Sequence, residues 1–292
     1  MTLASLIPLL VKLSIMLSVI AIGLRATFTD TTYLFNRPAL LARALIAMNV
    51  IMPAVAVFIA LSLNLNAHVE IALVALSVSP IPPILPNKML KAGGTEQYTI
   101  GLLVAASLLS VVLIPLIMNL FELISGIPMQ MGVWAVLKVV LTSILIPLLI
   151  GIAIRAISPS IADKIAETVG LVALIMLVLS ALPILFTSVR AILTLVGDGT
   201  LLALATFAIV GLIVGHLLGG PNLANRPVLA LATSARHPAV ALSIAHLNFP
   251  EQKLAGALVL IYLVLSAIMA ARYMNWAKRR VAGAGSGTQA QA

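Results

Sequence analysis

The sequence predicts an all-α polytopic membrane protein with about nine transmembrane helices. Of its 292 residues, 62% are hydrophobic and only 9% are charged, and the mean hydropathy is +1.20. Soluble chains carry roughly 25% charged residues, so soluble enzymes and nucleic-acid binders are excluded in spite of the net charge of +9. The absence of cysteine excludes disulfide scaffolds, thiolate metal sites and cysteine nucleophiles.

Nine apolar segments are long enough to span a bilayer, which takes about 20 helical residues. Polar or turn residues bound each of them, and the runs are too long and too uniformly apolar for barrel strands. The segments are Ser5–Leu24, Pro38–Leu63, Ala67–Ala92, Thr99–Leu120, Val133–Ile157, Thr168–Val189, Thr200–Leu218, Pro227–Leu247 and Lys253–Trp276.

The chain has the composition of one membrane domain followed by a short tail. Residues 1–277 form the predicted transmembrane domain, with halves 1–126 and 127–277. Met1–Leu24 has neither a basic start nor a small-residue cleavage pattern, so we expect a first span there rather than a signal peptide. Residues 278–292 start with basic side chains, and the residues after these are rich in Gly, Ala, Ser and Gln. This composition predicts a disordered cytoplasmic tail.

The distribution of Lys and Arg predicts the orientation. With the C-terminus in the cytoplasm, eleven basic residues lie at inner loops, their flanks or the tail, and only Arg190 and Lys253 lie at outer loops. This is a strong positive-inside bias. An odd number of spans then places the N-terminus outside, and we expect an integral protein of a bacterial inner membrane.

Two of the nine segments are interrupted by residues that break helices. One contains Ser79-Pro80-Ile81-Pro82-Pro83-Ile84-Leu85-Pro86-Asn87-Lys88, and the other contains Thr233-Ser234-Ala235-Arg236-His237-Pro238. Each break is followed by one further helix before its half ends. Paired breaks at matching positions are typical of inverted-repeat transporters, with the substrate site between the breaks. The alternative for the first break is a proline-rich loop between two short spans.

These segments resemble the bile acid:sodium symporter family over roughly Leu9 to Trp276. The resemblance rests on Phe35-Asn36-Arg37-Pro38, Ile51-Met52-Pro53-Ala54 and the two broken stretches, in that order and spacing. It implies the nine-helix form of the family, in which two broken helices cross inside a core domain. The implied panel domain contains segments one, five and six, and the implied core contains the other six.

The sequence departs from the family at the positions that bind sodium in coupled members. Where those members have Glu and Gln in the second broken helix, this chain has Ala232 and Arg236, and their ligating Gln in an earlier helix aligns with Met48. The first crossover reads Ile81-Pro82-Pro83 in place of Gly-Gly-Thr. A hard cation needs several oxygen ligands and is repelled by a guanidinium, so the usual sodium sites look dismantled.

The sign of the charged residues within the apolar segments suggests what replaces sodium. Lys12, Lys88, Lys138 and Arg236 lie within apolar segments, whereas none of the eight acidic residues lies deep in one. A charge at the bilayer centre costs roughly 2.5–3.5 kcal/mol and usually marks a site. We therefore expect Arg236, and at the other crossover Lys88, to act as tethered positive charges that attract an anion. Lys12, Lys88 and Lys138 could instead extend to the interface.

Polar residues near the breaks complete the predicted substrate site. His237, which also offers a proton-linked role, is joined by several hydroxyls and amides: Ser79, Asn87, Thr233, Ser234, Asn49, Ser107 and Ser110. The alternative for the hydroxyls is a hydrogen bond to the backbone of their own helix. Gly211 and Gly215 indicate close helix packing.

We expect a secondary transporter that moves a small organic anion by alternating access, without the usual sodium sites. Uniport and proton coupling are both open. Three alternatives remain. The first is a sodium symporter with relocated ligands at Asn49, Asn87 and backbone carbonyls, and the second is a channel or passive pore. The third is an intramembrane enzyme, against which the shortage of acidic residues in the membrane argues. No metal or cofactor is expected, and no phosphate-binding loop indicates ATP. The expected partners are the anion and membrane lipid.

Overall fold

The protein is described by a computed structural model covering residues 3–63, 65–82, 85–125, 133–195 and 199–289. Within these ranges the chain forms helices and their connections, and no strand. The elements are α1 (Leu3–Gly23), α2 (Phe28–Thr32), α3 (Pro38–Leu45), η1 (Ile46–Ile51), α4 (Met52–Leu63), α5 (Ala67–Val78), α6 (Leu85–Lys91), α7 (Glu96–Ser125), α8 (Val133–Val140), η2 (Leu141–Leu145), α9 (Ile146–Ile157), α10 (Pro159–Leu195), α11 (Thr200–Leu218), α12 (Asn225–Ser234), α13 (Pro238–Asn248) and α14 (Lys253–Gln289).

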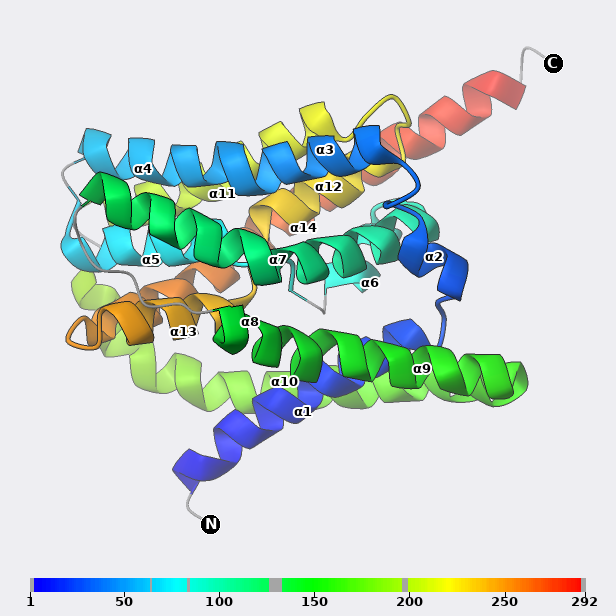
Figure 1. Ribbon diagram of the computed structural model, residues 1–292, viewed down its shortest axis with the longest axis horizontal. Coiled ribbons are helices and arrows are strands. Elements are labelled where there is room, and N and C mark those ends of the chain that lie inside the picture. Colours follow the sequence, from blue (N-terminus) through cyan, green and yellow to red (C-terminus); the bar gives the residue numbers. More distant parts are fainter. Residues whose placement is uncertain (1–2, 64, 83–84, 126–132, 196–198, 290–292) are drawn as a thin grey trace.

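The helices are arranged in two groups. Helices α1, α9 and α10 pack against one another and lie together at the lower side of Figure 1. A small cluster of Leu24, Ala162 and Ala166 forms part of their shared interior. The second group holds α3–α7 and α11–α14, whose buried side chains form two larger apolar clusters. The three helices of the first group belong to the segments that the resemblance implies for the panel, and their assignment as panel and core stays a prediction.

Both interrupted segments are broken where the sequence predicts. The segment Ala67–Ala92 becomes α5 and α6, and Pro227–Leu247 becomes α12 and α13. The segment Pro38–Leu63 stays continuous through a π-helical turn, η1, just before Pro53. Proline lacks the N–H that an α-helix requires and crowds the preceding turn, and a wider turn at that point relieves the crowding.

Three element boundaries differ from the sequence-based expectation. Helix α10 starts at Pro159 rather than at Thr168, so Asp163 and Glu167 lie in its first turns instead of in a connection. Proline fits the first turn of a helix because no intrahelical N–H is needed there. Helix α2 was not predicted; it depends on the side chain of Asp30, a local cap rather than a hydropathy signal.

The third difference is at the C-terminus, where the sequence predicts disorder. Helix α14 continues to Gln289, beyond the predicted start of the tail at residue 278. Extending an existing helix adds one hydrogen bond per residue and needs no new nucleus, which is why the polar composition does not end it. The division into membrane domain and tail stays a prediction.

The chain is a polytopic integral membrane protein. Four of the described helices are each long and apolar enough to cross a bilayer: Pro38–Leu63, Glu96–Ile124, Thr200–Leu218 and Leu254–Arg280. Shorter apolar helices include Lys12–Gly23, Ala67–Val78 and Leu141–Ile157. Because several segments are broken or short, the count of nine spans stays a prediction.

Two glycines of α11 allow it to approach α12 closely. A Cβ on Gly215 of α11 would lie 2.5 Å from Ala230 Cα of α12, and one on Gly211 would lie 2.8 Å from Ser234 Cα. The packing role predicted for these glycines is thereby confirmed. They hold α12, and with it the second break, against α11.

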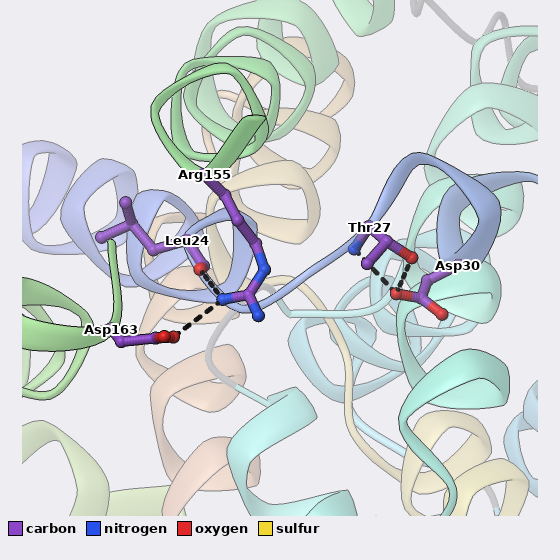
Figure 2. A network of polar contacts seen from close by, with 5 residues as sticks. All are labelled: Leu24, Thr27, Asp30, Arg155 and Asp163. Carbon is purple, nitrogen blue, oxygen red and sulfur yellow. Dashed lines mark hydrogen bonds and ion pairs between the residues drawn. The ribbon is translucent and has the colours of Figure 1, made fainter. Parts of the chain in front are cut away.

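The link between the two helix groups is fixed on both sides by polar contacts. Figure 2 shows Arg155 of α9 donating from Nη1 to Leu24 O at 2.8 Å and to Asp163 Oδ1 of α10 at 3.0 Å. A few residues on, the backbone N–H of Thr27 donates to Asp30 Oδ2 at 2.7 Å. The chain therefore leaves α1 and enters α2 through a short segment anchored at each end.

Candidate functional site

The two breaks cross each other inside the core. Helix α5 ends at Val78, because Pro80 and Pro82 remove two of the backbone donors that the next turn would need. Helix α12 ends at Ser234, and Ala235 is extended at φ −89° and ψ 143° before α13 starts at Pro238. The backbone N–H of His237 donates to Pro80 O at 2.8 Å, which joins segments 157 residues apart. The extended backbone of the second break thus finds a hydrogen-bond partner in the first break, as non-helical backbone inside a membrane requires.

Arg236 is the largest side chain that is fully buried, and it connects three segments. Its Nη1 donates to Ser79 O at 3.2 Å, in the first break, and its Nη2 donates to Met48 O at 3.4 Å, in η1. In a π-helix each carbonyl accepts from the N–H five residues later, as Ala47 O accepts from the N–H of Met52. Met48 O would therefore accept from the N–H of residue 53. Because residue 53 is proline, that carbonyl is free to accept from the guanidinium.

Several buried polar atoms around the crossing have no hydrogen-bond partner within the described part of the chain. They are Arg236 Nε, Ser234 Oγ and both ring nitrogens of His237. Buried polar atoms without a partner usually bind water or an ion or serve a function. The carbonyl of Ser234, in contrast, accepts from the buried hydroxyl of Tyr262 in α14. Tyr262 thus fixes the end of α12 and was not predicted as part of the site.

A cavity of about 320 Å³ lies between the two helix groups, beside the crossing. Its lining comes from both sides: α1 and α10 of the first group, and both breaks, α6 and α14 of the second. The residues are Ser14, Ile15, Ser18, Pro82, Leu85, Lys88, Leu174, Ala235, Pro238, Leu263, Ser266, Ala267 and Ala270. This is a size typical of small-molecule sites, and its lining is apolar with few polar groups, as such sites are.

The model of the sodium bile acid symporter family matches residues 12–195, more than half of the chain. The chain belongs to this family. It is therefore a membrane transport protein, and the resemblance found in the sequence is confirmed. No curated protein matches the chain.

In this family member, only Lys88 among the predicted substrate-binding residues lines the cavity, as far as the structure describes it. Its side chain is half-buried, and the described residues provide no hydrogen-bond or ion-pair partner for it. Asn87, the next residue back, and Asn49 in η1 are half-buried and do not line the cavity. Lys12 and Lys138 have exposed side chains outside it.

Arg236 and His237 lie at the crossing, buried behind the cavity wall. Their backbone neighbours Ala235 and Pro238 form that wall. The guanidinium is directed to carbonyls of the core, and direct contact between Arg236 and substrate stays a prediction. Arg236 Nη2 reaches Met48 O, so two of the positions at which the sequence is expected to depart from sodium-coupled members lie next to each other.

Four of the predicted hydroxyls donate within their own helices. Ser79 Oγ donates to Leu76 O and Thr233 Oγ1 to Leu229 O. Ser107 Oγ donates to Leu103 O and Ser110 Oγ to Ser107 O. A hydrogen bond to the backbone of the same helix is the alternative that the sequence left open. Each hydroxyl still has lone pairs that can accept, but an anion needs donors, so these four are poor anion ligands in this conformation.

Sequence reasoning missed the serines that do line the cavity. Ser14 and Ser18 lie one turn apart on α1, and Ser266 lies on α14. The i, i+4 spacing of the two α1 serines predicts a shared face. Their position in the first apolar segment, far from either break, gave no reason to assign that face to a site.

The described residues contain no group of three His, Cys, Asp or Glu side chains that could hold a metal ion. Sodium sites also use backbone carbonyls. At the crossing, two such carbonyls, Ser79 O and Met48 O, are occupied by Arg236.

Proposed function

We propose that this protein is a secondary transporter that binds a small organic anion in the cavity between α1, α10 and the crossing. The observation that carries the proposal is a largely apolar cavity of about 320 Å³ whose described lining contains one charged side chain, Lys88. The cavity borders both helix groups, so movement of one group against the other would open it to alternate sides.

Lys88 gives the cavity its preference for anions. No acidic side chain is present in its described lining, so a bound anion would face one unpaired ammonium in apolar surroundings, where charge interactions are stronger than in water. Helix α13 starts at Pro238 on the same wall, and the positive end of its dipole adds to the effect. The apolar remainder suits a substrate with a hydrocarbon body.

Replacing Lys88 with Gln should weaken anion binding at least tenfold, because a hydrogen bond from a charged donor contributes about 1.5–3 kcal/mol. Binding can be measured as stabilisation of the purified protein by a panel of carboxylates and sulfonates with apolar bodies of graded size, followed by uptake of the best compound into proteoliposomes. Lys91→Gln is the matched control, since Lys91 is exposed and lies outside the cavity. Lys88→Arg should retain most of the affinity. Equal losses in Lys88→Gln and Lys91→Gln would refute the role of Lys88.

We further propose that transport does not use sodium, because Arg236 provides a permanent cation where sodium would bind. Its guanidinium takes two backbone carbonyls at the crossing, one in the first break and one in η1. A second cation there would be repelled by the first. Arg236 would then hold the two breaks together in every state, whereas a sodium ion would do so only when bound.

The melting temperature of the purified protein should therefore be the same in sodium chloride and in choline chloride at equal ionic strength. A ligand that binds only the folded state stabilises it by RT ln(1 + [L]/Kd), about 2.7 kcal/mol at a hundredfold excess over Kd. A rise specific to sodium would instead favour a sodium symporter with relocated ligands, and Asn49 and Asn87 would be the first residues to replace.

Proton coupling is the driving force that we favour, and His237 is its candidate carrier. Both ring nitrogens are buried without a described partner, so they are free to take up or release a proton when the transport cycle opens the crossing to water. Uptake that follows a pH gradient in wild type and becomes gradient-independent in His237→Gln is the expected result.

Uptake at rates far above those of carriers would indicate a channel. We place the protein in a bacterial inner membrane with its C-terminus in the cytoplasm.

A further inference from the structure

A cluster of aromatic and basic side chains outside the cavity lining lies where α11, α12 and α14 meet. His216 Nδ1 and the hydroxyl of Tyr273 are 2.7 Å apart. The rings of His216 and Trp276 are 5.2 Å apart between centroids, and those of Tyr273 and Trp276 are 5.7 Å apart. The guanidinium of Arg280 lies 5.4 Å from the centre of the Trp276 ring. The cluster forms a rigid surface at the start of the basic C-terminal stretch.

Two adjoining pockets share this cluster. One, of about 80 Å³, is lined by Arg226 and Arg280 together with His216 and Trp276. The other, of about 290 Å³, is lined on the outer face of α11 by Leu212, Ile213 and Leu217, again with His216 and Trp276. Ile213 and Leu217 are 52% and 74% exposed, so this groove faces outward. A basic pocket therefore continues directly into an apolar groove.

The positive charge of the basic pocket is uncompensated. Arg226 Nε donates to Gly220 O at 3.1 Å, which holds the side chain in place. Within the described part of the chain, neither Arg226 nor Arg280 has a carboxylate within ion-pair distance, and no acidic residue lines either pocket. An anion next to a hydrocarbon chain matches this arrangement in both charge and polarity.

We propose that this surface binds a phospholipid with an anionic headgroup. The phosphate lies between Arg226 and Arg280, and one acyl chain follows the groove along α11 beside Trp276. Tryptophan favours the headgroup level of a bilayer. The basic residues that follow, Lys278 and Arg279, are exposed on α14, which projects beyond the other helices in Figure 1. An acyl-chain groove beside the phosphate pocket favours a lipid over a free phosphate.

The position of Trp276 allows the binding to be measured directly. The chain has two tryptophans, so Trp134→Phe leaves Trp276 as the sole tryptophan, which can be excited at a wavelength that tyrosine does not absorb. The full-length variant would be reconstituted in vesicles of phosphatidylcholine and phosphatidylglycerol, with brominated chains on one or the other lipid at constant total bromine. Quenching of Trp276 then reports the relative affinity for the two headgroups.

We expect phosphatidylglycerol to be preferred about fivefold or more, since each basic residue near an anionic surface favours binding by about this factor. Arg280→Gln should reduce the preference by about this factor, because Arg226 still lines the pocket. Arg279→Gln is the matched control, because it removes the same charge from the adjacent residue, which does not line the pocket. Inorganic phosphate, added as a competitor, should not remove the preference.

Several results would overturn the proposal. They are equal quenching by the two brominated lipids in the wild-type background, equal losses in Arg280→Gln and Arg279→Gln, and full displacement by inorganic phosphate. The last would identify the pocket as a phosphate site without a lipid. Because Arg280 is exposed, its replacement is not expected to unfold the protein, and circular dichroism of each variant checks this.

Discussion

Arg236→Ala should destabilise the protein by about 3 kcal/mol, since it removes two charge-assisted hydrogen bonds and leaves a cavity in the buried core. The bonds that are lost join the first break and η1 to the second break, through Ser79 O and Met48 O. The free energy of unfolding in mixed micelles measures the effect. Transport should fall with it, because the two breaks are then joined by fewer bonds.

A small cation should restore this variant if the guanidinium acts as a tethered ion. We expect added guanidinium, at concentrations well below those that denature proteins, to raise the melting temperature of Arg236→Ala and not that of the wild type. The matched control is Arg236→Met, which fills most of the volume without a donor and should show no such rescue. If Arg236→Met is as stable as the wild type, the charge is not what holds the crossing, a result known for other buried ionic groups.

The same variants test whether Arg236 contacts the substrate. Its guanidinium lies outside the described cavity lining, so a conservative change such as Arg236→Gln should alter stability more than anion affinity. A loss of affinity at unchanged stability would instead favour direct contact in another state of the transport cycle. Stability and anion affinity, measured on the same variant, therefore distinguish a structural role of the Arg236 cation from a role as substrate ligand.

Gly151→Ala should destabilise the first helix group by about 2–3 kcal/mol, as overpacking against rigid neighbours does. A Cβ at this position would lie 2.7 Å from Gly23 Cα in α1, which is backbone and cannot rotate away. Helices α1 and α9 would have to separate. Arg155, on the same helix, would then lose its bond to Leu24 O. The melting temperature and the rate of uptake should both fall.

Gly170→Ala is the control for this variant. It is also a helical glycine facing α1, but its Cβ would lie 3.6 Å from Ala21 Cβ, an ordinary contact. Alanine favours a helix by about 1 kcal/mol over glycine, so this change should be neutral or stabilising. If Gly151→Ala is tolerated as well as Gly170→Ala, the close approach of α1 and α9 is not needed for stability.

The position of the breaks could be predicted from sequence because it depends on local chemistry. Pro80 and Pro82 prevent α5 from continuing, and Pro238 suits the first turn of α13. Nine apolar runs of bilayer length leave little choice but helices. The family and the transport class follow from the order of those segments. The bulk of the fold is thus specified by hydropathy, proline position and glycine spacing.

The cavity lining could not be predicted in the same way. Ser14 and Ser266 enter it from helices that lie 252 residues apart in sequence and carry no break. Thr233 and Ser107 looked equally suitable, but neither lines the cavity. Which hydroxyl faces a cavity depends on the rotation of its helix against the neighbours, and in an apolar helix the hydropathy pattern does not define that rotation.

Hydropathy, proline position and the order of the segments are enough to predict a helical membrane transporter with two broken helices and a basic residue near each break. The surroundings of the two basic residues come from the fold: Lys88 lines the cavity, and Arg236 lies behind the crossing on the carbonyl that Pro53 leaves free. The physical reason is that the surroundings of a charge inside a membrane depend on what the fold brings within hydrogen-bond distance. Arg236 meets two backbone carbonyls, whereas Lys88 meets no described partner and faces the cavity.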